Sequence, residues 1–295
     1  MYIDVGDTKI FFEVYGSKLI PAGADTIVKP TLIFLHGGVG FFDHTVYIDY
    51  WSQFADVAEV IFLDFRGSGR SICDNQSTWN LKQWGQDIYD FCQRLHIEKP
   101  ILAGISFGGM AAMSCSIQYP DFPGAMVMTD TDVYIDQEHM LNLVQKKAIE
   151  NNQSPDELVN ITKQILSGPI TEDISEKYFS DVLNLFGNPP EILDKFNNPD
   201  PKLLNLQLGE LFLTGELLTF DYRDKLKGTQ CPVLFLSGDQ GPMHSIKTAK
   251  ELIAAFPEDK IQYKFFENAK PACYEFYPEE SLEIIRNFIE SLNYC

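Results

Sequence analysis

Short apolar runs alternate with longer segments whose apolar residues recur every three or four positions through the first third of the chain. The short runs predict strands, and the longer segments predict amphipathic helices that pack on a sheet. We therefore expect a largely parallel sheet covered by helices. Its first strands are predicted at Lys9 to Tyr15, Thr31 to Leu35, Val60 to Asp64, Ile101 to Gly104 and Ala125 to Thr129.

Two helix starts are marked by capping residues. Asn80 precedes a stripe of apolar residues that runs from Leu81 to Leu95, so we predict that it caps this helix. Ser154 begins the sequence SPDE, which has the pattern of a capping box with Pro155 at the first helical position.

The pattern changes after about Val133, where helical signals replace strand signals as far as Arg223. Strands are predicted again at Cys231 to Gly238 and at Lys260 to Glu267, with a helix between them and a last helix from about Pro278. The sequence thus predicts one α/β core, residues 1–132 and 225–295, interrupted by a helical cap, residues 133–224.

Composition and charge narrow the function classes. The formal net charge of −19 argues against nucleic acid and anionic membrane partners. The six cysteines form no C-x-x-C pair or zinc-like cluster, no cofactor motif is present, and no segment is long and apolar enough to span a bilayer. We expect a soluble cytoplasmic protein with free thiols that binds a small molecule without a metal or cofactor.

The sequence GISFGG, from Gly104 to Gly109, carries the strongest chemical signal. A strand leads into the G-x-S-x-G pattern, and small residues that let a helix approach the sheet follow it. Such an elbow holds its serine in a strained backbone and exposes the hydroxyl, which makes Ser106 a candidate nucleophile. The alternative is a packed serine in an ordinary strand-to-helix turn.

The sequence LHGGVG ends another predicted strand with glycines, where a backbone can approach a ligand. We predict that the backbone N–H groups of Gly38 and Phe107 form an oxyanion hole. A glycine-rich turn without an electrostatic task is the alternative for this loop.

Together HGGVG, DFRGSGRS, GISFGG and the FDYR of Phe220 to Arg223 resemble the α/β-hydrolase fold group around proline iminopeptidases. The resemblance covers nearly the whole chain and is weakest in the predicted cap. It implies an eight-stranded sheet, a Ser-Asp-His triad in that chain order, and hydrolysis of small amides or esters. Within that pattern Ser106 matches the nucleophile.

The chain departs from the family pattern at both partners of the serine. Gly241 stands where the family has its acid, and Pro271 stands where it has its histidine. Neither residue can take up a proton, and a serine hydroxyl without a base is a poor nucleophile. We therefore expect a missing or rerouted proton relay.

Other residues could replace the acid and the histidine that the family pattern places beside its serine. His244, in the loop that normally carries the acid, is the best candidate for the base, whereas His44 and His139 are weaker ones. Asp239 and Asp130 are candidate acids. In the predicted cap, Glu210 and Glu216 are candidates for binding a substrate amine, as cap acids do in iminopeptidases, although solvated helix charges are the default interpretation.

Two functions remain open. The first is slow hydrolysis of a small ester or amide through Ser106. The second is a non-hydrolytic descendant, either a small-molecule binder or a catalyst of the lyase or cyclase type, that uses the capped pocket.

Overall fold

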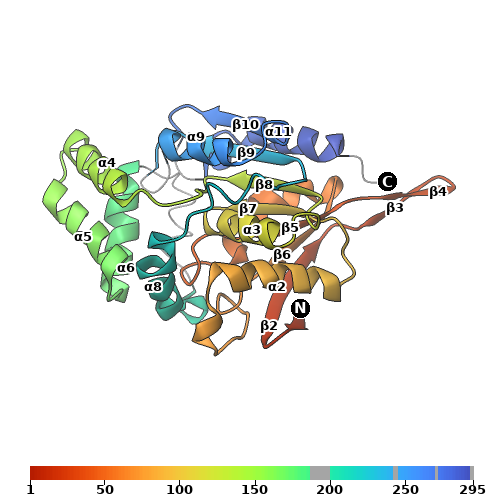
Figure 1. Cartoon of the computed structure of the whole chain (residues 1–295), viewed down its shortest axis with the longest axis horizontal. Coiled ribbons are helices and arrows are strands. Elements are labelled where there is room, and N and C mark those ends of the chain that lie inside the picture. Colours follow the sequence, from red (N-terminus) through yellow and green to blue (C-terminus); the bar gives the residue numbers. More distant parts are fainter. Residues whose placement is uncertain (187–199, 242–244, 270–271, 293–295) are drawn as a thin grey trace.

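A computed structural model of the chain describes residues 1–186, 200–241, 245–269 and 272–292. Eight strands form one sheet in the order β1-β2-β6-β5-β7-β8-β9-β10. The contacts of β2 with β1 and β6 are antiparallel, and the six strands from β6 to β10 are parallel. This confirms the predicted eight-stranded, mostly parallel sheet (Figure 1).

The predicted strands are present with boundaries that differ by at most two residues. They are Thr8–Tyr15 (β2), Thr31–Leu35 (β5), Glu59–Leu63 (β6), Ile101–Ile105 (β7), Ala125–Thr129 (β8), Val233–Gly238 (β9) and Ile261–Phe266 (β10). The central strands are apolar throughout because helices cover both of their faces. Three further strands were not predicted: Tyr2–Val5 (β1), Leu19–Ala22 (β3) and Asp25–Val28 (β4).

Helices pack on both faces of the sheet. One face carries α2 (Leu81–Arg94), α3 (Phe107–Gln118) and α9 (Ile246–Ala255) around Trp84 and Phe91. The other carries η1 (His44–Tyr47), α1 (Ile48–Trp51), η2 (Ser52–Asp56), α10 (Cys273–Phe276) and α11 (Pro278–Ser291).

The described chain between β8 and β9 is helical. It forms a block at one end of the molecule, opposite the β3–β4 hairpin (Figure 1). Its own apolar cluster centres on Met140, Ile161 and Phe186. The helices are α4 (Gln137–Glu150), α5 (Pro155–Ser167), α6 (Glu172–Lys177), the π-helical turn η4 (Tyr178–Val182), η5 (Leu183–Phe186), η6 (Pro201–Leu203), α8 (Leu206–Thr214) and η7 (Glu216–Leu218).

The two helix N-caps predicted from the sequence have different outcomes. The Asn80 side chain accepts from the backbone N–H of Gln83, 2.9 Å away, which confirms the first cap. The predicted capping box at Ser154 is wrong, because its side chain makes no capping hydrogen bond. Pro155 presets the first helical residue, and Asp156 and Glu157 interact favourably with the helix N-terminus, so α5 begins without that bond.

The structure also describes the length and polarity of the helices and the state of the cysteines. No helix among the described residues is long and apolar enough to cross a bilayer. The cysteines within the described residues are free and buried: Cys73, Cys92, Cys115, Cys231 and Cys273.

Candidate active site

Ser106 lies between the end of β7 and the start of α3. Its backbone has φ 50° and ψ −115°, a region that residues with a side chain rarely adopt. Hydrogen bonds hold its backbone: its N–H donates to the Thr129 carbonyl at 3.0 Å, and its carbonyl accepts from the Thr131 hydroxyl at 2.7 Å as well as from N–H groups in the first turn of α3. The half-buried Ser106 therefore has the strained conformation predicted for a nucleophile elbow.

The glycines around Ser106 are fixed by close packing. A Cβ at Gly108 would lie 1.9 Å from the Leu35 carbonyl oxygen, which is backbone and cannot move aside. A Cβ at Gly104 would lie 2.5 Å from the Gly108 carbonyl carbon. Only glycine lets α3 approach β5 and β7 this closely.

The loop after β5 passes beside the serine. Gly38 has φ +61°, and a Cβ there would collide with the Phe42 ring at 2.2 Å. Its carbonyl accepts from the N–H groups of Phe41 and Phe42, which fixes the turn. Phe107 is the first residue of α3, where an N–H has no carbonyl partner within the helix. Both predicted donors border the same cavity as Ser106.

This cavity has a volume of about 190 Å³. Its floor is formed by Gly37, Gly38, Ser106 and Phe107, and side chains of the helical block, including Ile165 and Phe179, cover it. Most of the remaining wall is aliphatic or aromatic. Such a cavity suits an apolar group placed next to the serine hydroxyl.

Asp130 follows β8 and lies at the edge of the cavity. Its Oδ1 accepts from the backbone N–H of Gly238 at 3.0 Å, and its Oδ2 accepts from that of Cys273 at 2.8 Å. The buried carboxylate thus ties the end of β9 to the loop after β10. This is where a histidine-orienting acid is useful, but two backbone groups already bind it.

The other predicted relay positions are described only in part. Gly241 is buried, and Asp239 is half-buried, with an Oδ1 that has no hydrogen-bond partner among the described residues. Neither residue belongs to the described cavity wall. His244 and Pro271 lie outside the described residues. The described residues that line the cavity include no histidine.

Glu210 and Glu216 each bind a backbone N–H group. The carboxylate of Glu210 accepts from Ile170 at 2.6 Å, which joins α8 to the segment before α6. That of Glu216 accepts from Leu81 at 2.6 Å and so caps α2. Burial raises the pKa of Glu216, although this hydrogen bond opposes the rise. Neither carboxylate is part of the described cavity wall.

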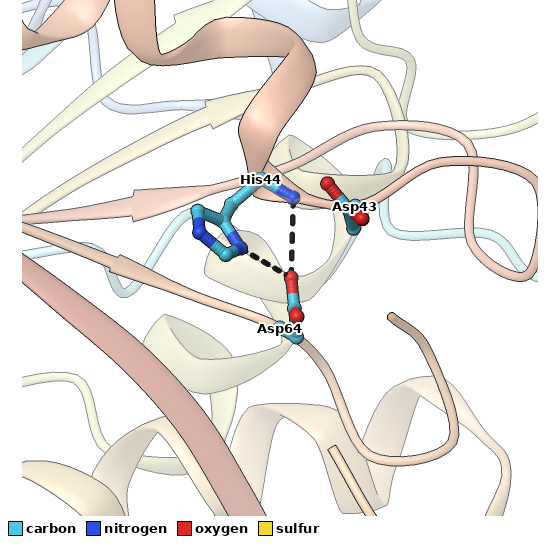
Figure 2. A group of neighbouring side chains, drawn as sticks. All are labelled: Asp43, His44 and Asp64. Carbon is cyan, nitrogen blue, oxygen red and sulfur yellow. Dashed lines mark hydrogen bonds and ion pairs between the residues drawn. The ribbon is translucent and has the colours of Figure 1, made fainter. Parts of the chain in front are cut away.

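His44 is fully buried and does not lie at a cavity mouth. Its Nδ1 donates to Asp64 Oδ1 at 2.6 Å, and its backbone N–H donates to the same oxygen at 3.1 Å (Figure 2). Its Nε2 lies 3.7 Å from the Glu13 carboxylate on β2. His44 does not line the described cavity wall, so it is not placed to act as a base for Ser106.

Asp43, His44 and Asp64 lie close enough together to hold a cation (Figure 2). Their oxygens are nevertheless engaged: Asp64 Oδ2 accepts from the Arg70 N–H, and Asp43 Oδ1 accepts from the Thr45 N–H. The Arg70 guanidinium also lies 3.7 Å from Asp43 Oδ2. These contacts explain the cluster as a hydrogen-bonded brace behind the glycine loop.

The remaining histidines lie elsewhere. His36 is buried in the glycine loop, where its Nε2 accepts from the Phe65 N–H and burial lowers its pKa. His96 is exposed, and His139 lies in the first turn of α4. None of the three borders the described part of the cavity.

Two polar cavity residues were missed from the sequence. Asp132 is 2% exposed and lies two residues beyond Asp130, so the sequence TDTD held a signal for it. Tyr47 also lines the cavity and is buried, but nothing in the local sequence distinguishes it from the neighbouring core aromatics.

The chain is similar to several hydrolases. A proline iminopeptidase of Clostridioides difficile is 24% identical over 286 residues, which covers 92% of each protein. The 3-oxoadipate enol-lactonase 1 of Acinetobacter baylyi is 23% identical over 262 residues, which covers 85% of each. A crystal structure of a proline iminopeptidase from Mycobacterium smegmatis superposes with a TM-score of 0.73 at 17% identity, covering 98% of this chain and 97% of that one.

A family model described as the alpha/beta hydrolase fold matches residues 30–276. Proline iminopeptidases are among the relatives that the chain resembles. Because the family match spans most of the chain, the protein belongs to the α/β-hydrolase fold family.

Proposed function

We propose that this protein hydrolyses a small ester or amide with an apolar acyl group, using Ser106 as the nucleophile. The observation that carries the proposal is the strained Ser106 backbone at the floor of an apolar cavity. Strain of this kind destabilises the fold by about 1 to 3 kcal/mol, so it needs a reason to persist. Exposing a nucleophile to a bound substrate is such a reason.

The chemistry follows from the surrounding groups. The Ser106 oxygen attacks the carbonyl carbon, and the carbonyl electron pair moves onto its oxygen. The N–H groups of Gly38 and Phe107 stabilise this oxyanion. The proton that the Ser106 hydroxyl loses passes to the leaving group as the bond between the carbonyl carbon and that group breaks. Water then attacks the acyl-enzyme, which releases the acid and returns a proton to the Ser106 oxygen. The helical block acts as the cap that encloses the apolar group.

The proton relay limits the rate. With Gly241 and Pro271 at the family's acid and histidine positions, catalysis falls toward the roughly 10³- to 10⁴-fold over water that an oxyanion hole and binding provide alone. His244, assisted by Asp130 or Asp239, is the base that we propose for any faster turnover. Its position in the sequence, between β9 and α9, where the family has its acid, supports this assignment.

The test combines covalent labelling and turnover. A fluorophosphonate probe should label Ser106, and a p-nitrophenyl ester with a short alkyl chain should turn over slowly. Ser106→Ala should abolish both. Ser116→Ala is the matched control, because this buried hydroxyl on α3 has no hydrogen-bond partner in the part of the chain that the structure describes and lies outside the described cavity wall. Absence of labelling together with absence of Ser106-dependent turnover would refute the proposal.

His244→Ala separates the two forms of the relay. If His244 is the base, turnover should fall by roughly 10²-fold or more, the usual contribution of a general base. An unchanged rate would exclude His244 and leave the oxyanion hole as the main source of catalysis.

A second candidate function has one specific observation in its favour. The carboxylate of Asp130 already binds two backbone groups, and the described cavity wall holds no histidine. A protein that binds an apolar ligand without cleaving it fits these facts. Ligand binding that stays unchanged in Ser106→Ala, with no labelling of the wild type, would favour this function over hydrolysis.

A further inference from the structure

The phenol of Tyr47 lies beside the nucleophile. Tyr47 ends η1, on the sheet face opposite α3, and its ring packs against Phe34 with centroids 5.3 Å apart. A methyl group placed on Gly37 would lie 3.0 Å from the Tyr47 hydroxyl and 3.5 Å from the Ser106 Cβ. The hydroxyl and the serine therefore border the same small gap, which the glycine keeps open.

The chemical state of this hydroxyl follows from its surroundings. Burial raises the pKa of Tyr47 well above its ordinary value, nearby Glu275 adds to the rise, and a hydrogen bond from the Gly37 backbone opposes it. The phenol is therefore protonated at neutral pH. A protonated phenol can donate a hydrogen bond, and Tyr47 lines the same cavity as Ser106.

We propose that the Tyr47 hydroxyl is a third hydrogen-bond donor to the oxyanion that forms when Ser106 attacks a carbonyl. This inference rests on the proposed function. Tyr47 approaches the reacting carbonyl from the Gly37 side, next to the backbone donor Gly38. No proton is transferred by Tyr47, whose hydroxyl only donates a hydrogen bond to the oxygen that gains the electron pair.

The advantage of such a donor is specific to this chain. In a site without a complete relay, stabilisation of the oxyanion supplies most of the remaining catalysis. A donor whose ring is packed in the core needs no reorganisation when the charge develops. The interaction is stronger in the transition state than with the neutral substrate, so it acts on kcat and leaves KM nearly unchanged.

The test compares Tyr47→Phe with Tyr50→Phe. Each change deletes one buried phenol oxygen from the same aromatic cluster, but Tyr50 donates to or accepts from Ser281 at 2.6 Å and lies outside the described cavity wall. Tyr47→Phe should slow fluorophosphonate labelling of Ser106 and lower kcat for a p-nitrophenyl ester by roughly 10- to 100-fold, with KM within about twofold. Tyr50→Phe should reduce thermal stability and leave both rates within about twofold.

Several outcomes overturn the inference. Labelling of Tyr47→Phe at the wild-type rate would exclude the donor role, and so would an equal loss of rate in both variants. A rise in KM with unchanged kcat would indicate a contact with the ground state. If the wild type itself is not labelled, the proposed function fails first, which distinguishes the two failures.

Gly37→Ala provides a second variant should Tyr47→Phe not fold. Its methyl group would fill the gap and displace the hydroxyl by a few tenths of an ångström. Labelling of Ser106 should slow by at least about tenfold, in line with the loss of one oxyanion donor. A wild-type labelling rate in this variant would also contradict the inference.

Discussion

The two sides of the cavity differ in what holds them together. On the nucleophile side, backbone packing fixes the geometry: Gly108 contacts the Leu35 carbonyl with no room for a Cβ, and Ser106 has a positive φ. On the relay side, a carboxylate fixes the geometry, because Asp130 binds the backbone at the end of β9 and in the segment after β10. The nucleophile side holds Ser106 in one backbone conformation, whereas the relay side is held together by the hydrogen bonds that Asp130 accepts.

Not every feature of the nucleophile side is evidence for catalysis. Gly104 and Gly108 are required by the approach of α3 to the sheet, with or without catalysis. The strained φ of Ser106 is different, because it is unfavourable for any residue with a side chain. The strain, the gap beside Gly37 and the positive φ of Gly38 are therefore the features that point to chemistry.

The largest expected effect comes from restoring the relay. The double change Gly241→Asp and Pro271→His places the family's acid and histidine at their positions. If the nucleophile side is intact, hydrolysis of a p-nitrophenyl ester should rise by roughly 10²-fold, the contribution of general acid–base catalysis. The measurement is the Ser106-dependent steady-state rate.

The single changes serve as controls for this prediction. Pro271→His alone should give a smaller gain, because position 241 then has no carboxylate to orient the new imidazole. The experiment is repeated in a His244→Ala background, which removes any existing base. A double variant that remains at the wild-type rate in both backgrounds would show that the nucleophile side no longer supports hydrolysis.

A smaller effect is expected from Asp130→Asn. An amide has one acceptor oxygen, so either the Gly238 or the Cys273 N–H loses its partner. Losing a buried charge-assisted hydrogen bond should lower the free energy of unfolding by about 1.5 to 3 kcal/mol, measured by urea denaturation. Asp239→Asn is the control, since its buried Oδ1 has no partner.

The result also tests the contrast itself. If Asp130→Asn leaves stability unchanged but slows labelling of Ser106, the carboxylate acts in a relay and not as an anchor of the loops. Loss of both would indicate that it has both roles.

The sheet was predictable because its strands carry their own signals. Thr31–Leu35 and Ala125–Thr129 were predicted to the residue, since buried parallel strands are continuous apolar runs. The β3–β4 hairpin was missed because its side chains are mostly exposed and show no regular alternation. The local pattern of apolar residues therefore identifies the strands that are buried in the core.

The site was predictable only where a motif lies within one segment. GISFGG identified Ser106, and HGG identified Gly38. The contact between Gly37 and Tyr47 joins residues that are ten positions apart through a loop and a short helix. The bond from Cys273 to Asp130 spans 143 positions. Such contacts depend on the tertiary structure, so no local sequence pattern predicts them.

Acid denaturation should reveal the brace behind the glycine loop. Burial acts to raise the pKa of Asp64, but the hydrogen bond and charge of His44 outweigh it and lower that pKa overall. A depressed pKa in the folded state stabilises the protein above the unfolded value of about 3.9, and this stabilisation disappears as the pH falls through the folded value. Asp64→Asn should therefore destabilise the protein at pH 6 more than at pH 3.

Urea midpoints at pH 6, 4 and 3 measure this difference. Asp4→Asn, at an exposed position on β1, corrects for the general loss of one negative charge. If the wild type and Asp64→Asn keep a constant difference across this range, the ionised Asp64 does not stabilise the loop in the manner described.

The smallest expected effect tests the strain at Ser106 directly. Ser106→Ala removes the hydroxyl and keeps the Cβ, so the positive φ remains unfavourable. Ser106→Gly removes both, and glycine adopts this conformation without steric conflict. Because glycine also gains entropy in the unfolded chain, the net gain of Ser106→Gly over Ser106→Ala should be only about 1 kcal/mol in the free energy of unfolding. Neither variant should be labelled. If Ser106→Gly is no more stable than Ser106→Ala, the backbone strain is not stored at this residue, and the nucleophile side loses the feature that most separates it from ordinary packing.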